Sequence, residues 1–201
     1  MKNIAVVVGL AVYLCSGIFN PAVAQEAKMN DTLKTIFNRK SVRSYTGEAV
    51  SKEQLMMLAR AGMAAPTAVD SRPWDFILIT DKAVLKKLSE ALPYAKMAEQ
   101  AGAAIVVTGD LDRQFGGKDA SFWVFDCSAA SENILLAAES MGLGAVWTAV
   151  YPDNERVLAV RKTLGIPDNV VPLNFIPIGV PTGKDKPKDK FNPKQTHENS
   201  W

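Results

Sequence analysis

A chain of 201 residues, 48% of them hydrophobic, is long enough for one well-filled core, so a single domain is expected. Its 23 Lys and Arg residues nearly balance its 21 Asp and Glu residues, which argues against a nucleic-acid partner. The only histidine, His197, lies in a polar segment near the C-terminus. A Ser-His-Asp triad, a Cys-His pair and a histidine-rich metal site therefore all lack their central residue, which excludes the common hydrolase and zinc-enzyme classes.

The N-terminal segment has the pattern of an export signal. Lys2 supplies a positive charge, Ile4–Phe19 is apolar, and Ala22-Val23-Ala24 is an A-x-A cleavage site. The apolar run is interrupted by polar residues and is shorter than the roughly 18–20 residues of a spanning helix. We therefore expect a signal peptide over residues 1–24 and no permanent membrane anchor.

Cleavage after this signal predicts an exported, periplasmic protein with one domain over residues 25–201. A translation start at Met29 would instead give a cytoplasmic form. Loss of the leader removes Cys15 and leaves Cys127 as the only cysteine, so the mature chain has no internal disulfide. Cys127 lies in an apolar stretch, where we expect it to be a small buried residue.

In the first half of the chain, the patterns favour helices with one early strand. Asn30–Asn38 is typical of a short helix, and Ser51-x-x-Gln54 is a capping box that begins a longer one. Phe76–Thr80 alternates as a strand does, and helical patterns follow at Lys82–Leu92 and Tyr94–Ala101.

The second half contains the remaining strands and the longest helix. Helices are expected over Ser121–Met141, which Gly142 ends, and from Pro152-Asp153 through Leu164. Buried or alternating strands are expected over Ala103–Gly109, Ala145–Val150 and Pro172–Val180, and a mobile loop over Asp110–Ala120. Because helices and strands do not follow a strict βαβ rhythm, the order predicts an α+β fold with a sheet flanked by helices.

No glycine-rich dinucleotide motif is present, because Gly142-Leu143-Gly144 follows a helix and precedes a strand, the reverse of the required order. An enzyme built from this chain must then take its reactive atoms from a bound cofactor. The segment Arg39-Lys40-Ser41-Val42-Arg43 places cations around a hydroxyl, which suits a phosphate, although cations at a helix end also complement the helix dipole. A second cationic run, at Lys184, Lys186, Lys188, Lys190 and Lys194, is typical of a solvated tail.

Four segments, in order, resemble the FMN-dependent nitroreductase family. Arg39-x-Ser41-x-Arg43-x-Tyr45 is similar to the family's N-terminal signature. Ala61–Thr67, leading to Arg72–Phe76, resembles its alanine-proline-serine and asparagine-x-glutamine-proline-tryptophan segments. Met141–Trp147 resembles its glycine-leucine-glycine turn, and Ile178–Pro181 its glycine-tyrosine-proline. The resemblance spans roughly Leu33 to Lys190.

The resemblance implies a homodimer with a nitroreductase-like fold, in which a mainly antiparallel central sheet lies between helices in three α/β/α layers. It implies an FMN-dependent enzyme that passes hydride from NADH or NADPH to a small acceptor, such as a nitroaromatic or a quinone, by a ping-pong mechanism. Flavin N5 would carry the hydride, so no catalytic side chain is required. Two alternatives stay open: a same-fold flavin enzyme that dehalogenates or destroys flavin, and an exported flavin-binding protein without turnover. Export favours a different electron donor, because reduced nicotinamide is scarce outside the cytoplasm.

The resemblance also assigns cofactor contacts. Arg39, Ser41 and Arg43, with Lys40 in the same cluster, would hold the FMN phosphate and ribityl chain. Lys188 or Lys190 would close the phosphate site from the tail. Some contacts would come from a partner subunit, because the family's flavin lies at the dimer interface.

Around the flavin ring, the resemblance places Pro66 and Thr67, and it places the backbone of Ala145, Val146 and Trp147 along the ring.

Asp70 and Arg72 depart from the family pattern, which has asparagine and glutamine at these positions. An ionised Asp70 only accepts hydrogen bonds and Arg72 only donates them. We hypothesise that the two side chains compensate, either by pairing or by placing positive charge near N1–C2=O of the ring. The Asp110–Ala120 loop, with Phe122 and Trp123, is a candidate substrate lid, although Trp123 also fits a core position.

Overall fold

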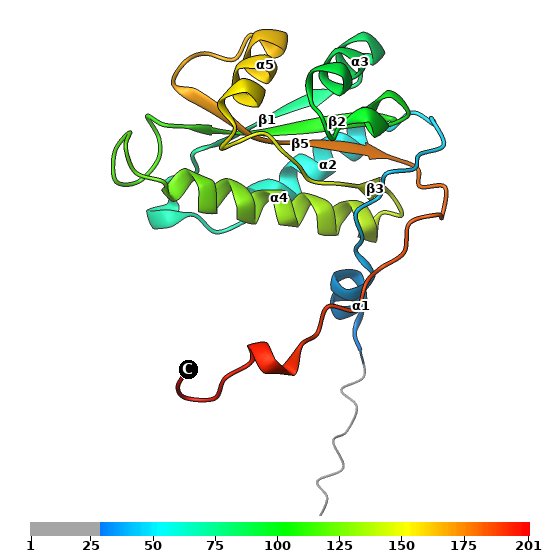
Figure 1. Cartoon of the computed structure of the whole chain (residues 1–201), viewed down its shortest axis with the longest axis vertical. Coiled ribbons are helices and arrows are strands. Elements are labelled where there is room, and N and C mark those ends of the chain that lie inside the picture. The colour runs from blue at the N-terminus through cyan, green and yellow to red at the C-terminus, as the bar shows by residue number, and fades with distance from the viewer. Residues whose placement is uncertain (1–28) are drawn as a thin grey trace, which may run out of the picture.

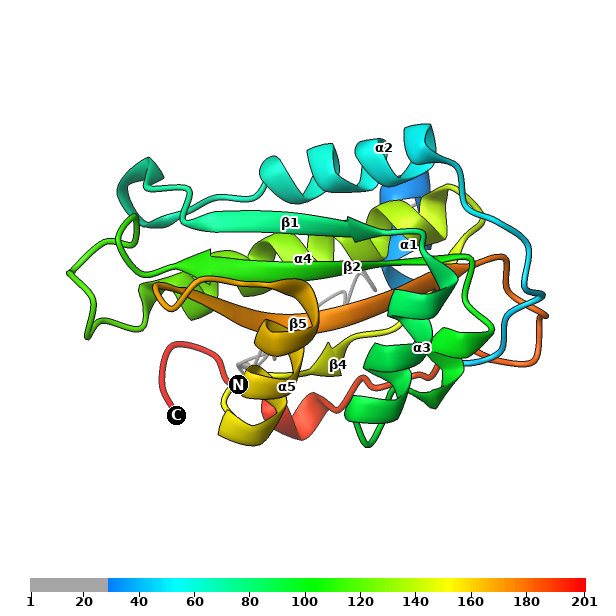
Figure 2. The ribbon, with the colours of Figure 1, turned by 90° about the horizontal axis from the view of Figure 1, so that it is seen from above.

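The computed structural model describes residues 29–201, so the predicted signal peptide lies outside the described residues. A five-stranded antiparallel sheet forms the centre of the fold (Figures 1 and 2). Its strands are β1 (Trp74–Ile79), β2 (Ala103–Asp110), β3 (Gly144–Ala145), β4 (Thr148–Ala149) and β5 (Val170–Gly179). The spatial order is β1-β2-β5-β3, and β4 also pairs with β5.

One face of the sheet is covered by α2 (Lys52–Met63) and α4 (Phe122–Ser140), which lie side by side beneath it in Figure 1. The apolar residues of α2 pack with alternate residues of β2, such as Ile105 and Val107, in the larger of two buried clusters. The predicted capping box begins α2, with Ser51 accepting from Gln54 N and Gln54 accepting from Ser51 N.

The other face is covered by α3 (Lys82–Ala91) and α5 (Asn154–Leu164). The intervening residues of β2, Ala104 and Val106, pack on this side with Phe175 of β5. Since successive side chains of a strand point to opposite faces, a continuously apolar strand is what a sheet covered on both sides requires. The three α/β/α layers and the antiparallel sheet are therefore confirmed.

Two parts of the chain extend from this body: α1 (Asp31–Asn38), which has no buried residue, and the tail after β5 (Figure 1). The described residues also include three short 3₁₀ turns, at Ala68–Asp70, Lys96–Glu99 and Pro193–Gln195. Within residues 29–201, no helix combines the length and apolar character needed to cross a membrane.

The helix predicted over Tyr94–Ala101 is wrong, because only the 3₁₀ turn Lys96–Glu99 forms there. The buried residues Ala95, Ala98 and Ala101 recur every third position, and the amides of Ala98 and Ala101 bond three residues back. Three residues per turn is the period of a 3₁₀ helix, whereas an α-helix would have moved these side chains off one face.

The single strand predicted over Ala145–Val150 is also wrong, because it is divided into β3 and β4 at Val146 and Trp147. Val146 N still bonds to Pro177 O at 3.3 Å, but Pro177 has no N–H with which to continue the ladder. The division leaves Trp147 between two short strands.

Trp123 belongs to the core rather than to a lid. It is 4% exposed and packs against Gly109, where a Cβ atom would lie 2.3 Å from the indole ring. Cys127, on the same helix, is fully buried as predicted. A loop covers residues 111–120, since β2 extends through Asp110, and Phe122 begins α4 at 41% exposure.

Candidate functional site

The segment Arg39–Tyr45 is fixed along the edge of the sheet. Ser41 bridges Ala145 in parallel fashion, and Val42 N donates to Ala145 O at 3.0 Å. Val42 packs against Gly144, where an added Cβ would lie 2.6 Å from the valine side chain. Tyr45 is buried, and its hydroxyl lies 2.7 Å from Val42 O and 3.0 Å from Pro177 O. These contacts leave the polar residues of the segment facing outward.

The C-terminal tail runs beside this segment. Thr46 N donates to Val180 O, and Thr182 N donates to Ser44 O, each at 3.0 Å. Further along, Arg43 N donates to Asp185 Oδ2 at 3.0 Å. Two segments from opposite ends of the described chain are thus joined by main-chain hydrogen bonds, and Figure 1 shows them side by side below the sheet.

Between them lies a cleft of about 500 Å³, which we call the cationic cleft. Seven cationic side chains and one carboxylate line it, together with Ser41 and Pro187: Arg39, Lys40, Arg43, Lys184, Lys186, Lys188, Lys190 and Asp185. The structure therefore brings together the six residues predicted to hold the phosphate and ribityl chain.

The cations of the cleft differ in their partners. Arg39 Nε lies 3.1 Å from Glu132 Oε1, and Lys40 Nζ lies 3.0 Å from Glu139 Oε1, so carboxylates of α4 orient both side chains. Within residues 29–201, no carboxylate oxygen lies within 4.0 Å of the side-chain nitrogens of Arg43, Lys188 or Lys190. Among the same residues, Lys184 and Lys186 likewise have no carboxylate oxygen within 4.0 Å, so five of the seven cations hold the uncompensated charge of the cleft.

A second cleft of about 460 Å³, the aromatic cleft, adjoins the first through Arg43, which lines both. Its other lining residues come from the loop after α3, from the 3₁₀ turn Lys96–Glu99, from β4 and the residue before it, and from α5: Pro93, Tyr94, Lys96, Met97, Trp147, Thr148, Ala149 and Arg156. The Arg156 guanidinium lies 5.5 Å from the centre of the Tyr94 ring. Cations and aromatic rings therefore meet in one concave site.

Sequence reasoning found Trp147 of this cleft but missed Tyr94, Lys96 and Arg156. Tyr94 and Lys96 were assigned to a helix that does not form, and the 3₁₀ turn places them at the cleft instead. Arg156 follows the N-cap Asp153, and its Nε pairs with that carboxylate at 3.2 Å. A signal was available in the Pro93–Lys96 segment, whose proline precedes an aromatic and a cationic residue.

The remaining predicted ring contacts are distributed differently. Ala145 and Val146 are buried at 5% and 2% exposure, so only their backbone can approach a ligand. Pro66, Thr67, Asp70 and Arg72 lie in the turn between α2 and β1 and line neither cleft. One chain alone therefore does not bring these four residues to either cleft.

The Thr67–Arg72 turn contains a charged pair. Arg72 Nε and Nη2 donate to the two carboxylate oxygens of Asp70 at 2.7 and 2.5 Å. The hydrogen bonds from Arg72, together with its positive charge, lower the pKa of Asp70, so both groups are charged at neutral pH. The hypothesis that these two side chains pair is confirmed.

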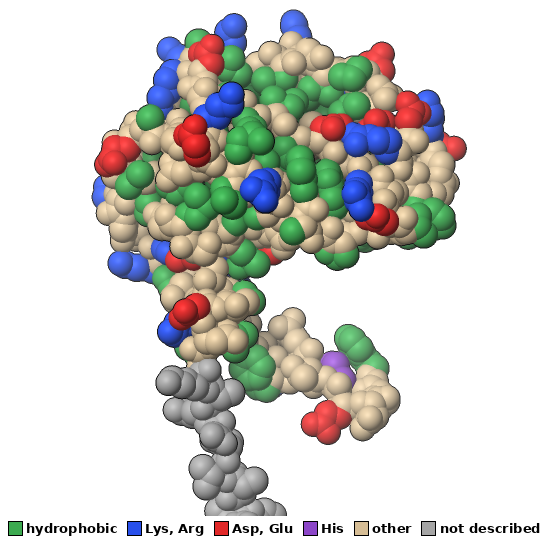
Figure 3. All heavy atoms as spheres, turned by 180° about the vertical axis from the view of Figure 1, so that it is seen from behind, with side chains coloured by type: hydrophobic (Ala, Val, Ile, Leu, Met, Phe, Trp, Pro, Cys, Tyr) green, Lys and Arg blue, Asp and Glu red, His purple; other side chains and the backbone are tan. Residues whose placement is uncertain are grey.

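Neither Cys127 nor His197 lines either cleft. Burial raises the pKa of the Cys127 thiol far above its usual value, and the thiol donates to Thr108 O at 3.4 Å. His197 is exposed near the end of the tail (Figure 3), and its ring stacks on that of Trp201 with the ring centres 4.5 Å apart. Within residues 29–201, no cluster of His, Cys, Asp and Glu could hold a metal ion.

Comparisons with known proteins agree with this arrangement. The model of the nitroreductase family matches residues 36–93 and 89–180. A protein of Archaeoglobus fulgidus, provisionally named NADH dehydrogenase/NAD(P)H nitroreductase, is 43% identical over 86% of this chain and its own entire length. A crystal structure from Parabacteroides distasonis with the same provisional name has 53% identity and a TM-score of 0.81, covering 86% of this chain and 99% of its own. An FMN-dependent nitroreductase from Clostridium difficile has 28% identity and a TM-score of 0.76, covering 83% and 98%.

Proposed function

Because the chain belongs to the nitroreductase family, we propose that it is an FMN-dependent oxidoreductase that transfers hydride from NADH or NADPH to a small acceptor, such as a nitroaromatic or a quinone. The cationic cleft carries this proposal, since segments from both ends of the chain join to build it. Similar proteins support the cofactor and the donor, among them an NADPH-dependent FMN reductase of Bacillus subtilis that is 30% identical.

The cationic cleft fits the phosphate of FMN. A phosphate monoester carries close to two negative charges at neutral pH, and Arg43, Lys188 and Lys190 offer cations without carboxylate partners. Arginine donates to phosphate through two parallel N–H groups, whereas lysine acts as a point charge. Ser41 and the two α4-bound cations, Arg39 and Lys40, complete the site.

The aromatic cleft fits the ring of the same cofactor. Arg43 lies at the junction of the two clefts, so one ligand with an anionic end and a flat aromatic body can occupy both. Bound FMN would supply a ring that takes up hydride at N5 and passes it on. Trp147 and Tyr94 would limit water at the ring, and Lys96 and Arg156 would favour negative charge on it.

A second copy of the chain completes the site in this proposal. Helix α1 is too short to be stable without packing, yet its apolar residues Leu33, Ile36 and Phe37 are 37–61% exposed. An open groove of about 250 Å³ lies beside Ile36, between α1 and α4. A dimer that covers these surfaces could also present the Thr67–Arg72 turn of one copy to the flavin of the other.

The reaction proposed is ping-pong, with donor and acceptor using the same place above the flavin in turn. The test is purified protein with its absorption spectrum, native mass and steady-state rates. We expect a yellow dimer that consumes NADH or NADPH with a nitroaromatic or quinone and gives parallel double-reciprocal lines. Stable flavin without turnover would favour a carrier, and a colourless protein that refuses saturating FMN would refute flavin binding.

The export signal remains part of the proposal and has its own test. Expression of the full gene product should yield mature protein beginning near Gln25 in the periplasmic fraction, as the A-x-A site at Ala22-Val23-Ala24 predicts. Intact mass and N-terminal sequencing distinguish this product from one that begins at Met29. A product that begins at Met29 in the cytoplasm would contradict export.

A further inference from the structure

The Thr67–Arg72 turn has a backbone that side chains normally avoid. Val69, Asp70 and Arg72 have φ values of 47°, 57° and 47°, in the left-handed region that favours glycine. Such conformations persist only when the surrounding structure holds them, and they cluster at functional sites. The groups that hold this turn therefore bear on what it does.

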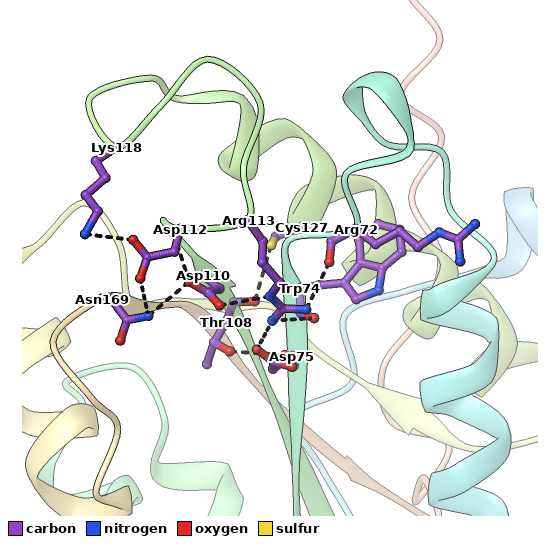
Figure 4. A network of polar contacts seen from close by, with 10 residues as sticks. All are labelled: Arg72, Trp74, Asp75, Thr108, Asp110, Asp112, Arg113, Lys118, Cys127 and Asn169. Atoms are coloured by element: carbon purple, nitrogen blue, oxygen red, sulfur yellow. Dashed lines mark hydrogen bonds and ion pairs between the residues drawn. The ribbon is translucent and has the colours of Figure 1, made fainter.

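Arg113 contacts the turn from the loop after β2 (Figure 4). Its Nη1 donates to Arg72 O at 3.2 Å, and its Nη2 lies 3.4 Å from Trp74 O and pairs with Asp75. Its Nε donates to Asp110 Oδ2 at 2.9 Å. One planar guanidinium thus links the main chain at the start of β1 to two carboxylates on neighbouring strands.

Arg113 is itself held in place. Asp110 accepts a second hydrogen bond from Asn169 Nδ2 at 3.1 Å, and its carboxylate also accepts from Asp112 N at 2.9 Å. Hydrogen bonds from Asp112, Arg113 and Asn169 outweigh the effect of burial and lower the pKa of Asp110, which keeps its negative charge beside the guanidinium. The orientation of Arg113 is therefore set by the carboxylates of Asp75 on β1 and Asp110 on β2, and Asn169, just before β5, holds the second of these.

Asp126 of α4 holds the other end of the turn. Its Oδ1 accepts from Ala68 N at 2.9 Å, and the residue is 5% exposed. Within the turn, Arg72 N donates to Thr67 Oγ1 at 3.2 Å. Arg113 and Asp126 thus hold opposite ends of a strained segment. This segment presents the Asp70–Arg72 pair at the protein surface.

We infer that Arg113 is a positioning residue for flavin recognition, acting through Arg72. By fixing the Arg72 carbonyl, Arg113 limits the directions in which the Arg72 guanidinium points, while the bond to Asp70 leaves Nη1 of Arg72 free to donate to an acceptor. The inference rests on the proposed function, because Arg72 can act only on a flavin that the dimer brings to it. It assigns to the loop after β2 an influence on the affinity for reduced flavin.

The test compares Arg113→Lys with wild type and with a matched control. Lysine keeps the positive charge but cannot reach two carboxylates and a carbonyl together. Lys118→Gln is the control, because Lys118 pairs with Asp112 at 2.7 Å in the same network without contacting Arg72 (Figure 4). Two quantities are measured: hydrogen exchange of the Asp70, Ser71 and Arg72 amides in flavin-free protein, and the ratio of the dissociation constants for reduced and oxidised FMN.

In Arg113→Lys, we expect these amides to exchange about fivefold faster, the effect of one lost hydrogen bond. The ratio of FMN dissociation constants should change by roughly three- to fivefold in the wild-type background and not in the Arg72→Gln background. Lys118→Gln should change neither quantity.

Unchanged exchange in Arg113→Lys would overturn the inference, as would an equal change of the FMN ratio in both backgrounds. Wild-type protein that binds no FMN refutes the proposed function instead, and the exchange measurement still decides whether Arg113 holds the turn. The two failures are therefore distinguishable.

Discussion

The cationic cleft and the Thr67–Arg72 turn treat charge in opposite ways. Seven cationic side chains and one carboxylate line the cleft, and five of these cations, namely Arg43, Lys184, Lys186, Lys188 and Lys190, have no carboxylate oxygen within 4.0 Å among the described residues. In the turn, Arg72 and Asp70 neutralise each other through two hydrogen bonds. The cleft has the net positive charge to bind a dianion. The turn has no net charge and can act on a ligand only through the orientation of its hydrogen-bonding groups.

This difference predicts different consequences of mutation. Like charges brought together oppose folding, so a bound anion should stabilise the cleft and the whole domain. The turn gains little from added charge and depends on how precisely it is held. Substitutions in the cleft should therefore change the affinity for FMN, and substitutions at the turn should change how the protein distinguishes the two redox states.

The largest effect is expected for Arg43→Gln, because Arg43 lines both clefts. Loss of one charged hydrogen bond to the phosphate, worth about 1.5–3 kcal/mol, should raise the dissociation constant for FMN about 30-fold. Quenching of FMN fluorescence measures this constant. Arg60→Gln removes an equal charge from the end of α2, away from both clefts, and should leave the constant unchanged; an equal loss in both variants would mean that only net charge matters.

A smaller loss is expected when the tail is neutralised by Lys188→Gln with Lys190→Gln. Lysines contact phosphate as point charges in an exposed tail, so the dissociation constant should rise about tenfold and depend less steeply on salt. Lys194→Gln is the matched control, since Lys194 lies on the same tail beyond the cleft. Wild-type affinity in the double variant would remove the tail from the phosphate site.

Tyr45→Phe tests how the cleft is attached to the sheet. Val42 O and Pro177 O would lose a buried donor, which should lower the free energy of unfolding by about 1–3 kcal/mol near pH 7. Burial, with a smaller contribution from Asp185, raises the pKa of Tyr45 in the folded state. The unfolded tyrosine ionises near pH 10, so wild type loses this stability as the pH rises above about 10.

The difference in unfolding free energy between wild type and Tyr45→Phe should therefore shrink at alkaline pH. Urea unfolding at about pH 7, 9 and 10.5 measures it. Ionisation of Cys127 and of the other tyrosines contributes to both proteins and cancels in the difference. A difference that stays constant with pH would show that Tyr45 does not keep a raised pKa in the folded protein.

The cationic cleft could be predicted from the sequence because Arg and Lys residues are concentrated in the two segments that form it. Arg39–Arg43 and the tail lysines are dense in charge, and the family resemblance joined them across the chain. Main-chain hydrogen bonds of the Ser44–Thr46 segment with Val180 and Thr182 hold the two segments together, and no local sequence pattern predicts them. The sheet and most helices could be predicted from the periodicity of apolar residues and from N-cap residues such as Ser51 and Asp153. Both signals act over a few neighbouring residues.

The aromatic cleft and the support of the turn could not be predicted in this way. Tyr94 and Lys96 were assigned to an α-helix because the alanines near them recur every third residue. This 3₁₀ period is close to the period of an α-helix, about 3.6 residues per turn, so the two patterns are hard to distinguish in a short segment. Arg113 lies in a loop without a pattern, and its role depends on Asp75 and Asp110 from two strands paired in register. Such contacts are set by the tertiary fold, and only the Asp70–Arg72 pair, two residues apart, was accessible to local reasoning.

The smallest effect expected is also the one that most directly separates the turn from the cleft. Arg72→Gln leaves the phosphate contacts intact, so the dissociation constant for oxidised FMN should stay close to that of wild type. Loss of the positive charge near the ring should weaken binding of anionic reduced flavin by about 1 kcal/mol, which lowers the two-electron midpoint potential by about 20 mV. Spectroscopic redox titration of Arg72→Gln beside Asp70→Asn measures this shift, and Asp70→Asn should move the potential upward because it frees the arginine from its carboxylate. An unchanged potential in both variants would mean that the turn does not reach the ring. The cationic cleft would then be the flavin site, and the Asp70–Arg72 ion pair would have only a structural role.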